Sequence, residues 1–236
     1  AGFRLREITS CRSYAEYQEM AESFLNLYTI PAAKAAVVQL EHRLGQKYLY
    51  LPQCFGYDEI DQNQRRLAEA LGTTAPDSAQ ARLAADAALA RARDLIGNTP
   101  IAIDYTLTFR PLSLARLLAE HGFKVTQLFA DSFIAEEKDD FDWLQQNLPN
   151  LKLGATTHVK RRMLPRQNGG VPCLALGQKA AYFTGTDYFV NVVEGGGMYG
   201  YDGIRRLAGL MAEAFLAPKD VKKLIQVKGL GCDCCL

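Results

Sequence analysis

The sequence predicts an α/β fold in which parallel strands alternate with helices. From residue 101 onward, short apolar segments alternate with helical segments of about 8 to 12 residues. A connection of this kind between neighbouring strands requires a right-handed crossover, so the strands are expected to run parallel. The first part of the chain shows a similar alternation. We therefore expect two Rossmann-like units with parallel sheets and helices on both faces.

The first unit is expected at residues 1–97. Its elements are short strands and amphipathic helices that end at proline or glycine. The expected helices are 13–21, 32–44 and 58–71, and the expected strands are 24–30 and 47–51. Residues 76–96 are rich in alanine and predict a long connecting helix. No strand is expected before the first helix, so this would be a partial Rossmann-like unit.

The second unit is expected at residues 98–217, after a turn signalled by Asn98, Thr99 and Pro100. The expected strands are 101–105, 123–129, 151–154 and 172–176, and the helices between them are 112–121, 138–147 and 159–165. A C-terminal helix is expected from Tyr201 to Ala217. Residues 218–236 are expected to form a cysteine-containing tail.

The charge balance and the lengths of the apolar runs argue against nucleic acid and membranes as partners. The chain has 236 residues, with 27 Lys and Arg against 26 Asp and Glu. Non-specific nucleic-acid binding needs a basic excess that is missing here. No apolar run approaches the roughly 20 residues that span a bilayer, and the first residues contain no signal-peptide core. We therefore expect a cytoplasmic protein that binds neither nucleic acid nor membrane.

Cysteines gather at the end of the chain, where Cys232, Cys234 and Cys235 lie close together. A disulfide framework is not expected in a chain of this length without a secretion signal. Neighbouring thiolates could bind a metal ion or cluster. Such sites usually take ligands from two separated segments, so a mobile and reactive tail is the alternative.

A glycine-rich turn precedes the last predicted helix. Gly195, Gly196 and Gly197 lead into the sequence Tyr-Gly-Tyr-Asp-Gly, which begins at Tyr199. Asp202 is expected to be the N-cap of the helix, accepting hydrogen bonds from amides of the first turn. Taken alone, this pattern is typical of a loop that enters a surface helix.

Candidate ligand-binding residues follow the predicted strands, because ligands of open parallel sheets bind outside the carboxyl ends of the strands. They are Thr106, Thr108, Phe109, Arg110, Asp131, Ser132 and residues 155–158. We single out His158, Lys160 and Arg161, since a histidine and cations at a helix start could bind a carboxylate, a phosphate or the periphery of an acidic cluster. The alternative is a solvated basic helix face in which His158 makes one ordinary hydrogen bond.

Common nucleotide-binding and hydrolase motifs are missing from the sequence. The chain reads Thr-Leu-Thr-Phe-Arg-Pro after the strand at 101–105, where a dinucleotide fingerprint needs glycines that admit the pyrophosphate. No Gly-Lys-Ser/Thr loop and no Gly-x-Ser-x-Gly turn is present. Nucleotide binding and serine hydrolase chemistry are therefore not supported.

Six segments follow one another in a characteristic order: 101–105, 111–125, 151–154, 157–162, 170–177 and the Gly-Tyr-Asp-Gly turn at 200–203. Together they resemble the C-terminal half of a nitrogenase component 1-type protein. The resemblance implies an oxidoreductase component or a cofactor-assembly scaffold that takes electrons from an ATP-dependent iron–sulfur reductase. It also implies a homologous component 1 subunit as partner, and an iron–sulfur cluster or related metallocluster in the full-length protein.

This chain departs from the family at the expected cluster ligands. The catalytic subunit of the family has a cysteine after a middle-domain strand and a histidine upstream of the turn. Residues 28–31 contain no cysteine and residues 185–191 no histidine. Cys54, which follows the strand at 47–51, is the remaining candidate ligand. Since the family's first domain is not recognised here, we expect a fragment without a cluster of its own, and a non-catalytic α/β binding module is the alternative function.

Overall fold

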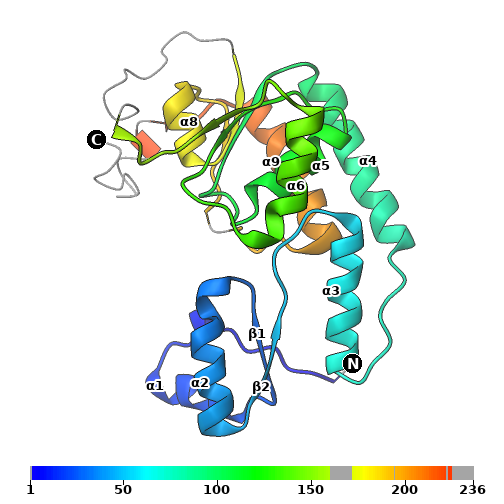
Figure 1. The fold of residues 1–236 in the computed structure, drawn as a ribbon, viewed down its shortest axis with the longest axis vertical. Coiled ribbons are helices and arrows are strands. Elements are labelled where there is room, and N and C mark those ends of the chain that lie inside the picture. The colour runs from blue at the N-terminus through cyan, green and yellow to red at the C-terminus, as the bar shows by residue number, and fades with distance from the viewer. Residues whose placement is uncertain (1, 160–171, 194, 222, 225–236) are drawn as a thin grey trace. The chain divides into compact units, whose positions relative to one another are not determined.

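The computed structural model of the chain describes residues 2–159, 172–193, 195–221, 223 and 224 (Figure 1). The chain divides into two compact units, each built from two stretches of sequence. The first comprises residues 1–52 and 63–75, and the second comprises residues 53–62 and 76–236. Both contain parallel strands and helices, which confirms the predicted fold class.

The first unit is built on two parallel strands, β1 (Leu25–Tyr28) and β2 (Lys47–Tyr50), which are connected by α2 (Lys34–Leu44). The C-cap of α2 is Gly45, whose φ of 68° is the left-handed conformation that glycine adopts without strain. The short elements of this unit are η1 (Ile8–Ser10), α1 (Tyr14–Gln18), η2 (Glu19–Glu22) and η3 (Pro31–Ala33). The helix α3 (Tyr57–Ala70) begins in the second unit and ends in the first.

A five-stranded parallel sheet forms the centre of the second unit. Its strands are β3 (Ile101–Asp104), β4 (Val125–Phe129), β5 (Lys152–Gly154), β6 (Leu174–Leu176) and β7 (Phe189–Val190). They lie in the order β5-β4-β3-β6-β7, and every neighbouring pair is parallel. All residues of the central strand β3 are buried, which is typical of a strand covered on both faces.

Alternate residues of β3 belong to two different hydrophobic cores. Ile101 and Ile103 join a large core, while Ala102 joins a smaller one. The large core is completed by α4 (Ala79–Ile96), α5 (Pro111–Glu120), α6 (Lys138–Asn147) and α9 (Gly200–Leu216). The smaller core is completed by α8 (Gln178–Thr184). Because successive side chains of a strand point to opposite faces, the helices cover both faces of this sheet.

The long alanine-rich helix lies in the second unit, although the sequence analysis assigned it to residues 1–97 as a connecting helix. Its buried residues are Ala85, Leu89, Ala92 and Ile96, and they pack in the same core as Leu207 and Met211 of α9. Small side chains let two helices approach closely, so the alanines are explained by packing against α9 rather than by a linking role.

Most other expected elements are found with small shifts in their ends, and α6 has the predicted bounds. The helix expected at 13–21 is divided into α1 and the 3-10 helix η2. Among the α-helices and strands of the described residues, the helix α8 and the two-residue strand β7 were not anticipated from the sequence, nor were the short 3-10 helices η1 and η4 (Ala135–Glu137). Most of the helix expected at 159–165 and most of the tail expected at 218–236 lie outside the described residues. In the described ranges, no helix is long and apolar enough to cross a membrane.

Candidate functional site

The order of the strands places a switch point between β3 and β6. The chain proceeds outward from β3 to β4 and β5, and then returns to the other side of β3 with β6 and β7. The helix after β3 is α5, in the large core, whereas the helix after β6 is α8, in the smaller core. Loops that leave adjacent strands toward opposite faces open a crevice at the carboxyl ends, where ligands of such sheets bind.

Lys179 lies at this crevice, in the first turn of α8. Its Nζ donates hydrogen bonds to the hydroxyl of Tyr105, directly after β3, and to Oγ1 of Thr156, after β5, the latter at 3.3 Å. The ammonium group also lies 4.5 Å from the centre of the Tyr105 ring. Within the part of the chain that the structure describes, this half-buried cation forms no ion pair. A partly desolvated ammonium whose two hydrogen-bond partners are neutral hydroxyls favours binding of an anion.

Asp104 is the last residue of β3, and it is fully buried. Its carboxylate accepts hydrogen bonds of 2.6 Å from the amides of Thr106 and Ala180. Burial raises the pKa of Asp104 above its usual value, although these hydrogen bonds and Lys179 act in the opposite direction. Asp104 thereby holds both the loop after β3 and the start of α8, the two segments that carry Tyr105 and Lys179.

Gly177 allows this arrangement, because it precedes α8 directly beside Asp104. A Cβ at position 177 would overlap the Asp104 carboxylate, and the φ of 111° is one that L-residues rarely adopt. Only glycine lets the backbone pass so close to the buried acid.

The loops after β4 and β5 are joined by Asp131. Its carboxylate accepts hydrogen bonds from the amides of Thr156 and Thr157 at 2.6 and 2.9 Å, and from both threonine hydroxyls. Burial acts to raise the pKa of Asp131, but the hydrogen bonds from Thr156 and Thr157 outweigh it and lower the pKa below its usual value. Asp131 thus orients Thr156 toward Lys179 and stays ionised.

The predicted anion-binding group is only partly described. His158 is exposed and follows the threonine pair, whereas Lys160 and Arg161 lie outside the described residues. Lys179 and Tyr105 were not predicted as site residues. The rule that selected residues after the other strands also applies to β6, so that rule could have found Lys179.

The Gly-rich turn has a structural role. Gly195, Gly196 and Gly197 all have positive φ, and the amide of Gly195 donates to the carbonyl of Leu107 at 2.7 Å. Gln53 donates to the carbonyl of Met198 at 2.8 Å and accepts from Thr108 at 2.7 Å. The turn therefore holds the loop after β3 in place, through Gly195 directly and through Gln53.

The prediction that Asp202 is the N-cap of the last helix was wrong. The N-cap is Tyr199, without a side-chain hydrogen bond, and Asp202 lies inside the first turn of α9, 2.8 Å from Arg205. The helix starts earlier than expected, and the acid still complements the positive end of the helix dipole.

Tyr201, from the Gly-Tyr-Asp-Gly turn, connects α9 to two other helices. Its hydroxyl donates to Asp61 of α3 at 2.7 Å and accepts from Arg82 of α4 at 3.0 Å. Burial and the contact with Asp61 raise the pKa of Tyr201 to about 12. The tyrosine therefore stays protonated and acts as a packing and hydrogen-bonding residue.

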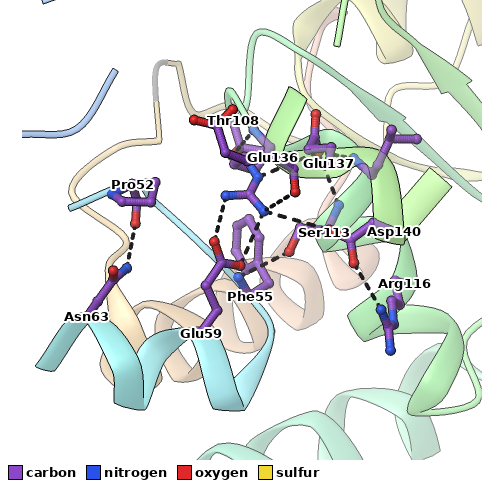
Figure 2. A network of polar contacts seen from close by, with 12 residues as sticks. Pro52, Phe55, Glu59, Asn63, Thr108, Ser113, Arg116, Glu136, Glu137 and Asp140 are labelled. Carbon is purple, nitrogen blue, oxygen red and sulfur yellow. Dashed lines mark hydrogen bonds and ion pairs between the residues drawn. The ribbon is translucent and has the colours of Figure 1, made fainter. Parts of the chain in front are cut away.

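Arg110 was expected at the carboxyl edge of the sheet, but its side chain is almost completely buried, with 2% exposed. Its guanidinium forms two hydrogen bonds with Glu59 of α3, at 2.8 and 3.2 Å. Glu137 of η4 (Ala135–Glu137) and Asp140 of α6 lie 4.0 and 3.7 Å away. Figure 2 shows these three acids converging from different elements. Arg110 is thus occupied by the protein's own carboxylates.

The residues described by the structure do not fit a metallocluster. Cys54 is 5% exposed and packs in the large apolar core. Across the described ranges, no group of three or more His, Cys, Asp and Glu side chains could hold a metal ion. The tail cysteines Cys232, Cys234 and Cys235 lie outside these ranges, so their metal binding stays a prediction.

Comparison with known proteins identifies the family. The profile described as "Nitrogenase component 1 type Oxidoreductase" matches residues 2–216. The chain belongs to the nitrogenase component 1-type oxidoreductase family. Curated proteins give no match.

A solved structure titled "Nitrogenase Cp1 at pH 6.5" has the same fold as this family member. The two superpose with a TM-score of 0.56 at 17% sequence identity, covering 84% of this chain. The chain spans 46% of the length of that protein. The similarity at this identity concerns the fold alone.

Proposed function

We propose that this chain is part of a cytoplasmic nitrogenase component 1-like oxidoreductase subunit, or of a metallocluster-assembly scaffold of that family. In that role it takes electrons from an ATP-dependent iron–sulfur reductase and assembles with a homologous component 1 subunit. The observation that carries the proposal is the family match over nearly the whole chain. Since the described residues do not fit a cluster, the cluster of the full-length protein would be held by residues elsewhere.

The contribution of this chain, in our proposal, is to bind an anionic group at the crevice between β3 and β6. Lys179 supplies the charge, while Tyr105 and Thr156 supply hydroxyls beside it. His158, Lys160 and Arg161 follow Thr156 in sequence and would extend the positive surface. A carboxylate or phosphate is the chemistry that such a set of donors recognises.

Metal analysis tests the family-level proposal. We expect the full-length protein, purified without oxygen, to contain iron and acid-labile sulfide. A colourless, iron-free full-length protein would instead support the alternative, a non-catalytic α/β binding module. The unfilled ligand positions at 28–31 and 185–191 are the observation that favours this alternative.

Replacing Lys179 tests the anion site. Lys179→Met is expected to weaken binding of inorganic phosphate or malonate by about 5- to 100-fold, because it removes one charge-assisted hydrogen-bonding group. Titration calorimetry or NMR shift changes would measure this. The double change Lys160→Ala with Arg161→Ala should weaken binding in the same direction.

Lys124→Met is the matched control for this test. Lys124 is an exposed lysine just before β4, at the amino edge of the same sheet, so binding should not change. Equal affinity of the wild type and Lys179→Met, with both proteins folded, would exclude the crevice as the binding site.

A further inference from the structure

Glu137 is a fully buried carboxyl group that holds the start of α5. Its Oε1 accepts hydrogen bonds from the amides of Leu112 and Ser113, at 2.8 and 3.2 Å. These amides belong to the first turn of α5, whose own N-cap, Arg110, gives no side-chain hydrogen bond. Glu137 therefore satisfies donors that a helix start leaves without partners.

The second oxygen of Glu137 has no such support. Among the described residues, buried Oε2 has no hydrogen-bond partner, and neither has Nε of Arg110, which lies 4.0 Å from Oε1. The two terminal nitrogens of the guanidinium, Nη1 and Nη2, are directed instead to Glu59, Asp140 and the carbonyl of Glu136. A buried carboxylate with one unpartnered oxygen is costly to ionise.

The charges in the ion-pair network that includes Glu137 do not balance. The cations are Arg110 and, on α5, Arg116, which pairs with Asp140 at 3.3 Å and with Glu120 at 2.9 Å. The acids are Glu59 from α3, Asp140 from α6 and Glu120 from α5, in addition to Glu137 itself. The network thus contains two cations and four carboxyl groups, so a buried acid within it gains by holding a proton.

We propose that Glu137 is a proton-binding latch: with its proton bound it keeps the first turn of α5 closed, and losing the proton loosens that turn. The proposal is independent of the anion site, because it concerns only contacts between α3, α5, η4 and α6.

The direction of the effect follows from proton linkage. Burial is the main cause that raises the pKa of Glu137 from 4.5 to about 7. When the turn opens, the carboxyl reaches water, regains its ordinary pKa and releases the proton. Opening therefore becomes easier as the pH rises from about 4.5 to about 7, and is constant outside this range.

Hydrogen exchange of the amides of Leu112 and Ser113 tests the latch in the wild-type chain. After correction for intrinsic exchange, the opening equilibrium constant should rise on the order of 50-fold between pH 5 and pH 8. Amides in the middle of α9 provide the internal reference for global unfolding. Glu137→Gln keeps an oxygen acceptor but cannot titrate. In this variant the amides of Leu112 and Ser113 should therefore stay protected from exchange at every pH.

Asp140→Asn is the matched control. It removes a neighbouring negative charge but leaves Glu137 in place, so the rise in opening should persist with its midpoint at lower pH. A wild-type opening constant that does not change with pH, or an equal dependence of the opening constant on pH in Glu137→Gln, would overturn the proposal.

If Glu137→Gln does not fold, an NMR titration of the Glu137 carboxyl resonance in the wild type decides. A titration midpoint near pH 7 supports the latch, and one below pH 5 excludes it.

Discussion

Replacing Arg110 with methionine is expected to lower the free energy of unfolding by about 3–5 kcal/mol, the usual cost of removing one partner from a buried ion pair. Methionine fills similar space, so the loss comes mainly from the carboxylates left behind. Glu59, Glu137 and Asp140 would lose their shared cation, and Glu137 is completely buried. Urea unfolding followed by circular dichroism measures the change.

The pH dependence and a matched control make this prediction specific. The loss should be larger at pH 8 than at pH 5, because protonated acids need no cation. Adding Glu137→Gln to the variant should recover part of the stability. Arg205→Ala removes an exposed pair with Asp202 and should change stability by at most about 0.5 kcal/mol. Similar losses at Arg110 and Arg205 would contradict the buried-network interpretation.

The second large effect is expected at Gly203. Its added Cβ would lie 2.5 Å from the carbonyl carbon and 2.9 Å from the carbonyl oxygen of Met198. Backbone cannot move aside as a flexible side chain can, so Gly203→Ala should destabilise the chain by about 2–3 kcal/mol. Thermal and urea unfolding would both report the loss.

Gly209 offers a control in the same helix. A Cβ at this position meets no atom within 4 Å. Gly209→Ala should therefore stabilise the chain by about 0.5–1 kcal/mol through helix propensity alone. If both alanine variants change stability in the same direction, the close approach of α9 to Met198 is not the reason why position 203 requires glycine.

The alternation of strands and helices was predictable because its signals are local. The bounds of α6 could be found from periodicity, and strands such as β3 from their apolar runs. The helix α8 was missed because it is a short helix between Gly177 and Gly185, and β7 because it contains only two residues. The position of α4 was missed because it depends on α9, which is distant in sequence.

For the candidate site, the sequence indicates a region but not the side-chain contacts within it. Sequence reasoning placed candidates at the carboxyl ends of the strands, which is where Lys179, Tyr105 and Thr156 meet. It could not predict that Arg110 turns inward, because its partner Glu59 is 51 positions away. Sequence reasoning also could not show that Asp131 orients two threonines rather than contacting a ligand itself.

The contact between Asp104 and Gly177 has a consequence for the divergence of this family. A side chain at position 177 would need space that only a smaller residue at position 104 could release. A smaller residue at position 104 would in turn remove the acceptor for Thr106 and Ala180. The two positions should therefore change together during evolution or not at all, and sequences that keep the acid should also keep the glycine.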